Sequence, residues 1–320
     1  MSATNRIGTR GLSREDWLAK RIGTIGASDM PSVCGFGYKT PNEIAGVVSG
    51  AVEPDDLSER EDVQLGIMTE PLNAQFYTKK TGRRVHRVNE MRYHPDLPFI
   101  HANLDRVAYG EKRIVELKWT NEFFGRATYE QDAESDSHSL PKPVLIQTQT
   151  QMAVYTGFDV LDVSVIIGGN RHRVFTVERD QRMIDNVLTI ASAFYDRMIR
   201  GVPQPIVTYE EAVTAFRQHV ARKIEATPEI AAAALRYREL NPTYPALEKE
   251  IKALKGIVAG FMGEADELTI GGKTAVTWRT QPDNRFDEAA FKAEHTDLFD
   301  QFLPTDKTSR VMRAPKGSFP

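Results

Sequence analysis

The sequence predicts an α/β protein, with a central mixed sheet flanked by helices and a mainly helical C-terminal extension. Helix-like and strand-like segments alternate between residues 13 and 200, in the order helix, hairpin, helix, strand pair and helix. Beyond about residue 205 the pattern changes to long helices. A chain of 320 residues is long enough for two folding units. We therefore expect residues 1–205 to form the core and residues 206–320 to form the extension.

Composition and charge limit the class of protein. Hydrophobic residues make up 41% of the chain and charged residues 27%, as in ordinary globular proteins. No apolar run reaches the ~20 residues of a membrane-spanning helix, and the polar start lacks a secretion signal, so we expect a cytoplasmic protein. The single cysteine, Cys34, argues against disulfides and cysteine-held metals. A net charge of −3 still permits a nucleic-acid partner, because acidic sites can offset basic patches.

Two short helices are predicted near the start of the chain. Ser13 caps the first, over residues 13–21, with Asp16 in the capping-box position three residues later. Pro41 suits the first position of the second helix, over residues 41–48.

A longer helix is predicted over residues 63–81. Gly82 supplies the residue that ends it. Met68, Leu72 and Phe76 recur at four-residue spacing along it. We expect these three side chains to form its buried face.

A β-hairpin is predicted from two strand-like runs, residues 99–108 and 112–119. Gly110 and Glu111 separate the runs, and a glycine in this place supplies the positive φ with which a type II′ turn begins. Such a two-residue turn fixes the pairing of the strands. In the resulting register, Asp105 lies directly opposite the residue at position 116.

The second half of the predicted core holds a helix, two strands and another helix. Pro143 introduces the first helix, over residues 144–156. Strand-like runs follow at residues 160–167 and 173–178, and an amphipathic helix is predicted over residues 181–200.

The extension is predicted to contain an antiparallel helical hairpin. Apolar residues on one segment alternate spacings of four and three, as in a coiled-coil seam: Leu247, Ile251, Leu254, Val258 and Phe261. Part of a facing stripe is expected from Phe216, Val220 and Ile224. A β segment over 268–278 and a helix near 287–295 complete the extension.

The predicted hairpin brings chemically active side chains together. Alternation along a strand places Glu116 and Lys118 on one face, and the register places Asp105 opposite Glu116. Two carboxylates at cross-strand distance repel each other unless a cation lies between them. Oxygen ligands of this kind suit Mg²⁺ or Mn²⁺. The alternative is that these residues only decorate a solvated strand face.

Five motifs in one order give the sequence a family resemblance. They are Arg21-Ile-Gly-Thr-Ile-Gly-Ala-Ser-Asp29, Gly66 to Glu70, Asp105, Glu116-Leu117-Lys118 and Gln147-Thr-Gln149-Thr-Gln151. In this order the chain resembles the YqaJ-like viral recombinases, which are related to the exonuclease of phage lambda and belong to the PD-(D/E)xK nuclease superfamily. The resemblance covers residues 21–200. One departure is Leu104, where some superfamily members place proline before the acid.

The resemblance implies a fold and an activity. The fold is a restriction-endonuclease-like core, here residues 1–205. The activity is Mg²⁺-dependent degradation of linear double-stranded DNA from its 5′ ends, with Mn²⁺ as a substitute, which leaves 3′ single strands for an annealing partner protein. It also implies a trimer and a place in the cytoplasm of a bacterium or phage-infected host.

Residue roles follow from the same resemblance. The resemblance implies that a metal ion is bound by Asp105, Glu116, Glu70 and the backbone carbonyl of Leu117. It also implies that Lys118 is the catalytic lysine. The glutamine of the facing helix corresponds to Gln149. DNA or 5′-phosphate binding is expected from Arg21, Ser28, Gln147 and Gln151.

Two points stay open from the sequence. On a helix, Gln147 and Gln151 share one face and Gln149 points elsewhere, so helical geometry and the resemblance favour different glutamines. The function also has alternatives: a structure-specific or restriction-type endonuclease, and a DNA-binding recombination accessory without turnover.

Overall fold

The computed structural model describes residues 5–129, 140–216, 223–280, 288–302 and 312. The chain forms two compact units, Met1–Ala212 and Val213–Pro320. This division lies close to the boundary after residue 205 that the sequence suggests. No helix within the described residues is long and apolar enough to cross a membrane.

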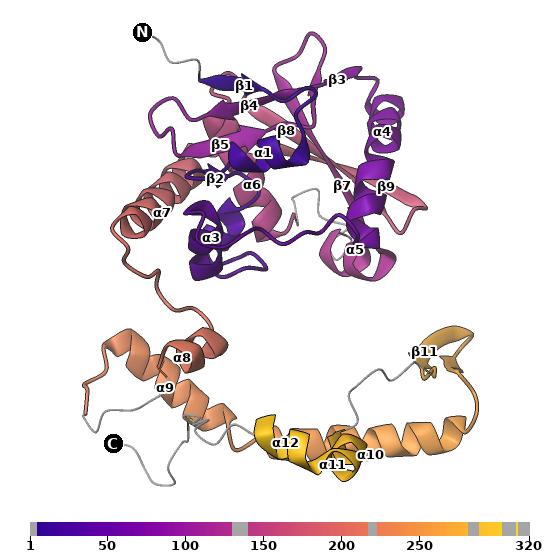
Figure 1. The fold of residues 1–320 in the computed structure, drawn as a ribbon. Coiled ribbons are helices and arrows are strands. Elements are labelled where there is room, and N and C mark those ends of the chain that lie inside the picture. Colours follow the sequence, from indigo (N-terminus) through magenta and orange to yellow (C-terminus); the bar gives the residue numbers. More distant parts are fainter. Residues whose placement is uncertain (1–4, 130–139, 217–222, 281–287, 303–311, 313–320) are drawn as a thin grey trace. The chain divides into compact units, whose positions relative to one another are not determined.

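A five-stranded mixed sheet forms the centre of the first unit (Figure 1). Its strands, in spatial order, are β3 (Val85–Arg87), β6 (Arg106–Ala108), β7 (Arg113–Thr120), β8 (Val160–Ile167) and β9 (Arg171–Glu178). The pair β7–β8 is parallel and the other neighbours are antiparallel. The predicted mixed sheet is therefore confirmed.

A second, four-stranded sheet corrects one predicted strand. Its order is β1 (Arg6–Gly8), β4 (Glu90–Tyr93), β5 (Ile100–Asn103) and β2 (Ile25–Gly26). The run 99–108 was expected to be one strand, but it divides into β5 and β6, which belong to different sheets. The break falls at Leu104 and Asp105. There the carboxylate of Asp105, rather than a strand carbonyl, accepts the backbone N–H of Leu117 over 2.8 Å.

Seven helices of the first unit lie within the described residues: α1 (Arg14–Ala19), α2 (Met30–Val33), α3 (Pro41–Val48), α4 (Glu61–Thr81), α5 (Glu122–Tyr129), α6 (Lys142–Val154) and α7 (Gln181–Ile199). Local signals set several ends. The hydroxyl of Ser13 accepts the backbone N–H of Asp16, and Gly82 ends α4 with a φ of 76°. The helices expected near residues 13–21, 41–48, 63–81, 144–156 and 181–200 are thus confirmed, with ends shifted by a few residues.

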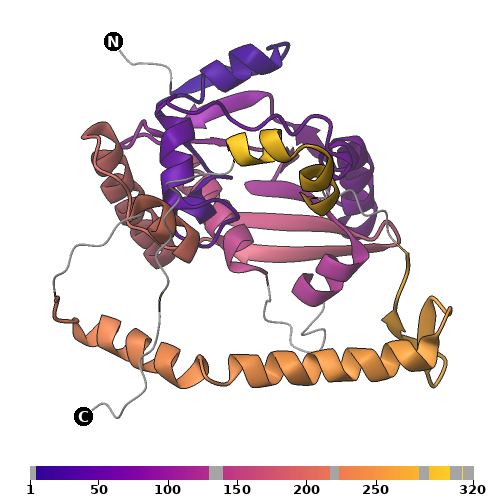
Figure 2. The same ribbon diagram turned by 60° about the horizontal axis from the view of Figure 1, so that its bottom comes forward.

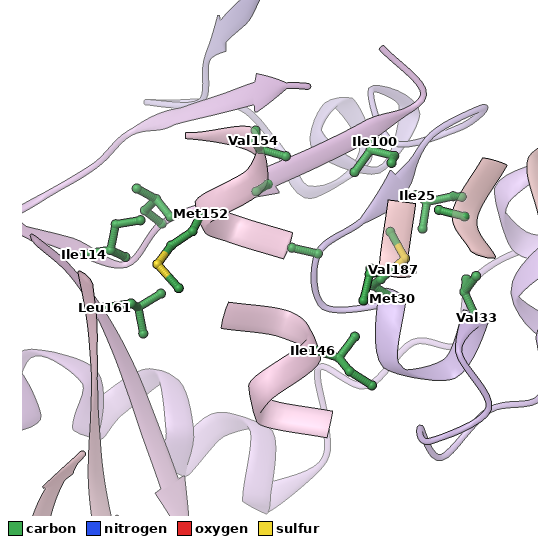
Figure 3. Close-up of a cluster of buried hydrophobic side chains, with 14 of the residues drawn as sticks. Ile25, Met30, Val33, Ile100, Ile114, Ile146, Met152, Val154, Leu161 and Val187 are labelled. Carbon is green, nitrogen blue, oxygen red and sulfur yellow. The ribbon is translucent and has the colours of Figure 1, made fainter. Parts of the chain in front are cut away.

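The core packs α6 against the central sheet. Figure 3 shows Met152 of α6 beside Ile114 of β7 and Leu161 of β8, and all three side chains are fully buried. Burial of one such side chain stabilises a fold by about 1.5–3 kcal/mol. Because several turns of α6 are anchored in this way, the polar side chains on the same helix are held firmly relative to β7.

Helix α4 faces the sheet with polar residues, so the buried face predicted for it is wrong. Met68 is 73% exposed, and Leu72 and Phe76 are also exposed. The buried residues of α4 are Asn73, Ala74 and Tyr77. The reason lies in the sheet beneath, which presents buried polar groups that α4 must satisfy. The amide of Asn73 donates to the backbone carbonyls of Lys118 and Ser164, and Tyr77 donates to Asp162.

The described residues of the second unit form helices and one β-hairpin. Its elements are α8 (Tyr209–Ala215), which begins just before the division, α9 (Pro228–Leu240), α10 (Tyr244–Met262), β10 (Glu267–Ile270), β11 (Lys273–Thr277), α11 (Glu288–Glu294) and α12 (Thr296–Phe302). The β segment expected over 268–278 is the hairpin β10–β11, and the helix expected near 287–295 is α11. Both predictions are confirmed.

The predicted antiparallel packing against the 247–261 seam is wrong. Ile224, from the expected facing stripe, lies outside any helix and is 81% exposed, while Phe216 lies in a turn. Val220 lies outside the described residues. Helices α9 and α10 follow each other end to end through the turn 241–243 (Figure 2). Pro242 and Pro245 interrupt the helix here, because proline cannot supply a backbone N–H.

Candidate active site

The hairpin β6–β7 has the predicted register. Arg106 pairs with Val115, so one step further along the same register Asp105 lies opposite Glu116. Gly110 adopts a φ of 74°, the positive value that the turn needs. A carboxylate from the end of one strand and a carboxylate from the next strand therefore lie side by side.

Glu116 is buried among donors from α6 and from its own strand. The side chain amide of Gln147 donates to Oε1 over 2.8 Å, and that of Gln151 donates to Oε2 over 2.7 Å. The ammonium of Lys118 lies 2.8 Å from Oε1. Both carboxylate oxygens thus have a fixed place, with only 4% of the residue exposed. Helix α6 thus holds Glu116 in position through two glutamines.

Lys118 lies beside Glu116 and is positively charged. Its Nζ also donates to Oε1 of Gln147 over 2.9 Å. Burial lowers the pKa of Lys118, but attraction to Glu116 and Asp105 outweighs burial and leaves the pKa above its usual value. Lys118 therefore carries a positive charge at neutral pH. In this state it can stabilise negative charge, but it has no lone pair with which to accept a proton.

Asp105 lies in surroundings that oppose its negative charge. The pKa of Asp105 is raised to about 7, first by burial and then by the charges of Glu116 and Glu70, while the Leu117 N–H and Lys118 act in the other direction. A carboxylate whose ionisation is opposed in this way gains from a bound cation. The positive charges around Asp105 therefore do not outweigh the effects that oppose its ionisation.

Glu70 reaches the same region from α4, but an arginine holds it. Nη1 of Arg106 donates to Oε1 of Glu70 over 2.6 Å, and Arg87 approaches the same oxygen at 3.8 Å. Across the described part of the chain, no three acidic, histidine or cysteine side chains form a ready metal cluster. Asp105 and Glu116 are therefore the pair that the structure places together, with Glu70 adjacent.

The donor set fits an oxygen-bound divalent cation. Beside the two acids, the side chain oxygens Oδ1 of Asn103 and Oε1 of Gln151 are buried without a hydrogen-bond partner among the described residues. Gln151 also donates to the backbone carbonyl of Asn103. Magnesium is commonly held by one or two carboxylates, with water or phosphate oxygens in its other positions. Asp105 and Glu116 would hold such an ion.

Gln149 lies away from the acids, which corrects the role that the resemblance gave it. Its amide donates to the backbone carbonyl of Glu178 over 2.8 Å, and its oxygen accepts the N–H of Asp180 over 2.9 Å. These bonds join α6 to the start of α7. The physical reason is the helical repeat, which turns residues two apart to different faces. Gln147 and Gln151 are the glutamines that contact Glu116.

Arg21 lies in a separate polar cluster around a glycine. Its Nη2 is 2.6 Å from Oδ2 of Asp29, whereas Ser28 is exposed. A Cβ at Gly26 would lie 2.8 Å from that Asp29 oxygen and 3.2 Å from Nε2 of His101, closer than side chains tolerate. Only glycine allows these groups to converge. The described contacts do not join Arg21 or Ser28 to the two acids.

The sequence did not reveal three contact residues of these clusters. Arg106 anchors Glu70, Asn73 bonds the backbone of Lys118, and His101 is buried beside Arg21 with its Nδ1 2.9 Å from the Thr24 hydroxyl. Desolvation lowers the pKa of His101 to about 3, so this ring is neutral. For Asn73 a signal existed, since it lies three residues after Glu70 and hence on the same helical face.

Comparisons with known proteins place the candidate site in a family context. The model of the YqaJ-like viral recombinase domain matches residues 16–159. The chain is also similar to the uncharacterized protein YqaJ of Bacillus subtilis (strain 168), with 26% identity over 298 residues, which is 91% of each chain.

Among solved structures, the chain resembles the alkaline exonuclease LHK-Exo from Laribacter hongkongensis. The TM-score is 0.49 and the identity 24%, over 58% of this chain and 93% of the other. A phage-related exonuclease from Haemophilus somnus 129PT has a TM-score of 0.42 and 14% identity, over 58% of this chain and 99% of the other. The family match covers α4, the hairpin β6–β7 and α6, and the described hydrogen-bond and ion-pair partners of the two carboxylates come from β7 and α6. Over residues 16–159 the chain is therefore similar to the YqaJ-like viral recombinases.

Proposed function

We propose that the chain is a metal-dependent deoxyribonuclease of the PD-(D/E)xK superfamily. Its substrate would be linear double-stranded DNA, degraded from the 5′ ends to leave 3′ single strands for recombination. One observation carries the proposal: Glu116, opposite Asp105 in the β6–β7 register, lies 2.8 Å from the charged Lys118 within a YqaJ-like domain. The combination of two acids and a lysine suits phosphodiester hydrolysis.

Each side chain of the site has a part in this chemistry. Asp105 and Glu116 would hold Mg²⁺, with Mn²⁺ as a substitute and the backbone carbonyl of Leu117 and Glu70 as further ligands. When bound, the ion supplies polarisation of the phosphoryl oxygen and a lower pKa for water. Lys118 stabilises the charge that develops on the phosphate. Gln147 bonds both Lys118 and Glu116 and so sets the distance between them.

Preference for a 5′ end requires a group that recognises its phosphate. The proposal assigns this role to Arg21 and Ser28. A guanidinium can pair with phosphate through two parallel hydrogen bonds. Arg21 is bonded to Asp29, so phosphate binding requires that Arg21 exchange or share this partner. A single-strand annealing protein as partner, and assembly into a trimer, belong to the same proposal.

The test is digestion of linear duplexes with 5′-phosphate or 5′-hydroxyl ends, alongside a closed circular duplex, in Mg²⁺ and in EDTA. We expect nucleotide release from linear DNA in Mg²⁺ only, faster from 5′-phosphate ends. Glu116→Gln removes one charge at nearly constant volume and should abolish release. The matched control is Glu111→Gln, the same change at the exposed turn of the same hairpin.

Other results would point elsewhere. Cleavage of the closed circle would identify an endonuclease and overturn the end-directed proposal. DNA binding without cleavage in Mg²⁺ or Mn²⁺ would identify a recombination accessory. Equal digestion by the wild-type protein and Glu116→Gln would remove Glu116 from the active site.

A further inference from the structure

Trp17 lies against the guanidinium of Arg21. The Cζ atom of Arg21 lies over the indole ring, 4.5 Å from its centroid. Trp17 belongs to α1, and Arg21 follows it by four residues, which is about one helical turn. The chain continues to turn beyond the end of α1, because the backbone N–H of Arg21 donates to the carbonyl of Leu18 over 2.9 Å. The spacing therefore brings the two side chains to the same side of this segment.

Two further residues fix the guanidinium of Arg21. Its Nη2 donates to Oδ2 of Asp29 over 2.6 Å. A Cβ at Gly26 would lie 2.9 Å from the same Nη2, so the guanidinium occupies space that any other residue at position 26 would fill. Trp17 contacts the face of the guanidinium, and Asp29 binds one edge. Together these residues leave the guanidinium little freedom to turn.

Most N–H groups of Arg21 stay available for a ligand. A guanidinium carries five N–H groups, and contact through its face uses none of them. Asp29 accepts one of the two N–H groups of Nη2, and no other hydrogen bond of this guanidinium is found among the described residues. The second N–H of Nη2 and an N–H of an adjacent nitrogen can bind two oxygens of one phosphate. Arg21 can therefore bind Asp29 and a phosphate at the same time.

Trp17 lies outside the hydrophobic core. None of the six residues of α1 is buried, and Trp17 itself is half-buried. Among the described residues, the buried core cluster takes its members from other elements. Removal of the indole ring should therefore affect the orientation of Arg21 more than the stability of the fold.

We propose that Trp17 is a positioning residue for recognition of a terminal 5′-phosphate. Its ring holds the guanidinium of Arg21 in the orientation in which the available N–H groups meet the phosphate. The inference rests on the proposed function, which assigns Arg21 to that phosphate. Without the ring, Arg21 has more rotamers to lose when the phosphate binds, so the phosphate binds more weakly. Trp17 acts through Arg21 and does not touch the reacting atoms.

The first experiment compares digestion of linear duplexes with 5′-phosphate and 5′-hydroxyl ends in Mg²⁺. For each protein, the ratio of the two kcat/KM values measures the preference for the phosphate. Trp17→Ala should lower this ratio about fivefold, which corresponds to about 1 kcal/mol, and should leave kcat/KM on 5′-hydroxyl ends within about twofold. Trp17→Phe keeps an aromatic face, so its ratio should stay within about twofold of the wild-type value. The matched control is Trp278→Ala, the same change in the second unit, which should not alter the ratio.

The second experiment measures binding of the same duplexes without cleavage. Fluorescence anisotropy in EDTA, with the dye at the 3′ end, gives the Kd for each type of 5′ end. The ratio of the two Kd values should fall about fivefold for Trp17→Ala and stay unchanged for Trp278→Ala. A double-mutant cycle then tests whether Trp17 acts through Arg21. In the background of Arg21→Ala, the change Trp17→Ala should have no further effect on the ratio.

Different failures have different meanings. If the wild-type protein prefers 5′-phosphate ends and Trp17→Ala keeps the full preference, the role of Trp17 is wrong and the proposed function stands. If the wild-type protein shows no preference in rate or in binding, Arg21 does not recognise the phosphate and both proposals fail at this point. If no duplex is digested, the nuclease proposal fails, and the Kd ratios still test Trp17.

A merely structural role of Trp17 would also give a distinct result. Loss of folding lowers kcat/KM on both types of end equally and leaves their ratio unchanged. An equal fall of this kind, or an effect of Trp17→Ala that persists in the background of Arg21→Ala, would overturn the proposal. Urea unfolding of Trp17→Ala and Trp17→Phe measures the folded fraction of each preparation.

Discussion

Arg106 donates a hydrogen bond to Glu70 across 2.6 Å and thereby ties the central sheet to helix α4. The side chain of Arg106 is 9% exposed, and that of Glu70 is 21% exposed. A second arginine, Arg87, approaches the same carboxylate oxygen at 3.8 Å, but its side chain is 65% exposed. One carboxylate thus has a buried and an exposed partner of the same chemical type.

The two arginines should differ in their effect on stability. Arg106→Met leaves the half-buried Glu70 without its close partner, and we expect the free energy of unfolding to fall by about 2–3 kcal/mol. Arg87→Met removes a solvated pair and should cost less than about 1 kcal/mol. Urea unfolding of both variants at pH 7 measures the difference. Equal losses would mean that burial does not decide the strength of these pairs.

Asp105 should make the metal-free protein less stable as the pH rises. The pKa of Asp105 is raised from 3.8 to about 7 in the folded chain, so between these values the folded chain binds more protons than the unfolded chain. The stability that protonated Asp105 contributes is present at low pH and is lost as the pH rises through about 7. Asp105→Asn replaces the carboxyl by an amide that does not ionise, so the variant should not lose this stability as the pH rises.

Urea unfolding in EDTA at pH 5 and pH 8 tests the effect. We expect Asp105→Asn to be more stable than the wild-type protein at pH 8, by about 1–3 kcal/mol, and the difference to shrink at pH 5. Added Mg²⁺ should stabilise the wild-type protein more than the variant, because only the former keeps both carboxylates. A variant less stable than wild type at pH 8 in EDTA would contradict the prediction.

Asn73 should be intolerant of a change of one atom. Its amide nitrogen donates to the carbonyl oxygens of Lys118 and Ser164 over 3.0 and 2.9 Å. Asn73→Asp replaces this donor by an oxygen that repels both carbonyls. We expect a loss of about 3 kcal/mol or more at pH 8, and a smaller loss at pH 5, where a protonated carboxyl can still donate.

The control for this change is Asn170→Asp, the same substitution at an exposed position in the β8–β9 turn. Its effect should stay within about 0.5 kcal/mol at both pH values. If Asn73→Asp were equally mild, the amide of Asn73 would have no part in holding α4 on the sheet.

Local signals explain why much of the fold was predictable. The hairpin register follows from the position of Gly110, whose φ of 74° no other residue type adopts readily. The start of α1 follows from Ser13 and Asp16, and the end of α4 from Gly82. In each case neighbouring residues alone decide the geometry. The juxtaposition of Asp105 with Glu116 was predictable for the same reason, because it depends only on counting from the turn.

Features that depend on distant residues were not predictable in this way. The four-residue spacing on α4 predicted an apolar buried face, but the sheet beneath it offers Asp162 and Ser164, which are buried and need polar partners. Tyr77 and Asn73 satisfy them, so the polar face turns inward. The seam on α10 gave the correct helix, but a repeat alone does not say which helix covers it. In both cases the helix was predicted correctly, and the error lay in what was expected to pack against it.

Gln147 and Gln149 of α6 should have different roles, and a substitution at each residue measures its role. Gln147 bonds both Lys118 and Glu116, whereas the described bonds of Gln149 go to backbone groups at the end of β9 and the start of α7. If the proposed nuclease activity is present, Gln147→Ala should lower kcat at least about tenfold and leave the unfolding free energy nearly unchanged.

Gln149→Ala should do the reverse. It removes two hydrogen bonds from a residue that is 2% exposed, so we expect a loss of about 1–3 kcal/mol in stability. The kcat per folded molecule should stay within about twofold of the wild-type value, because the acids keep all their contacts. Urea unfolding and single-turnover digestion of linear duplex DNA measure the two effects on the same preparations. A large fall in kcat for Gln149→Ala without loss of stability would restore the role that the family resemblance gave this residue, and would mean that α6 rotates when DNA binds.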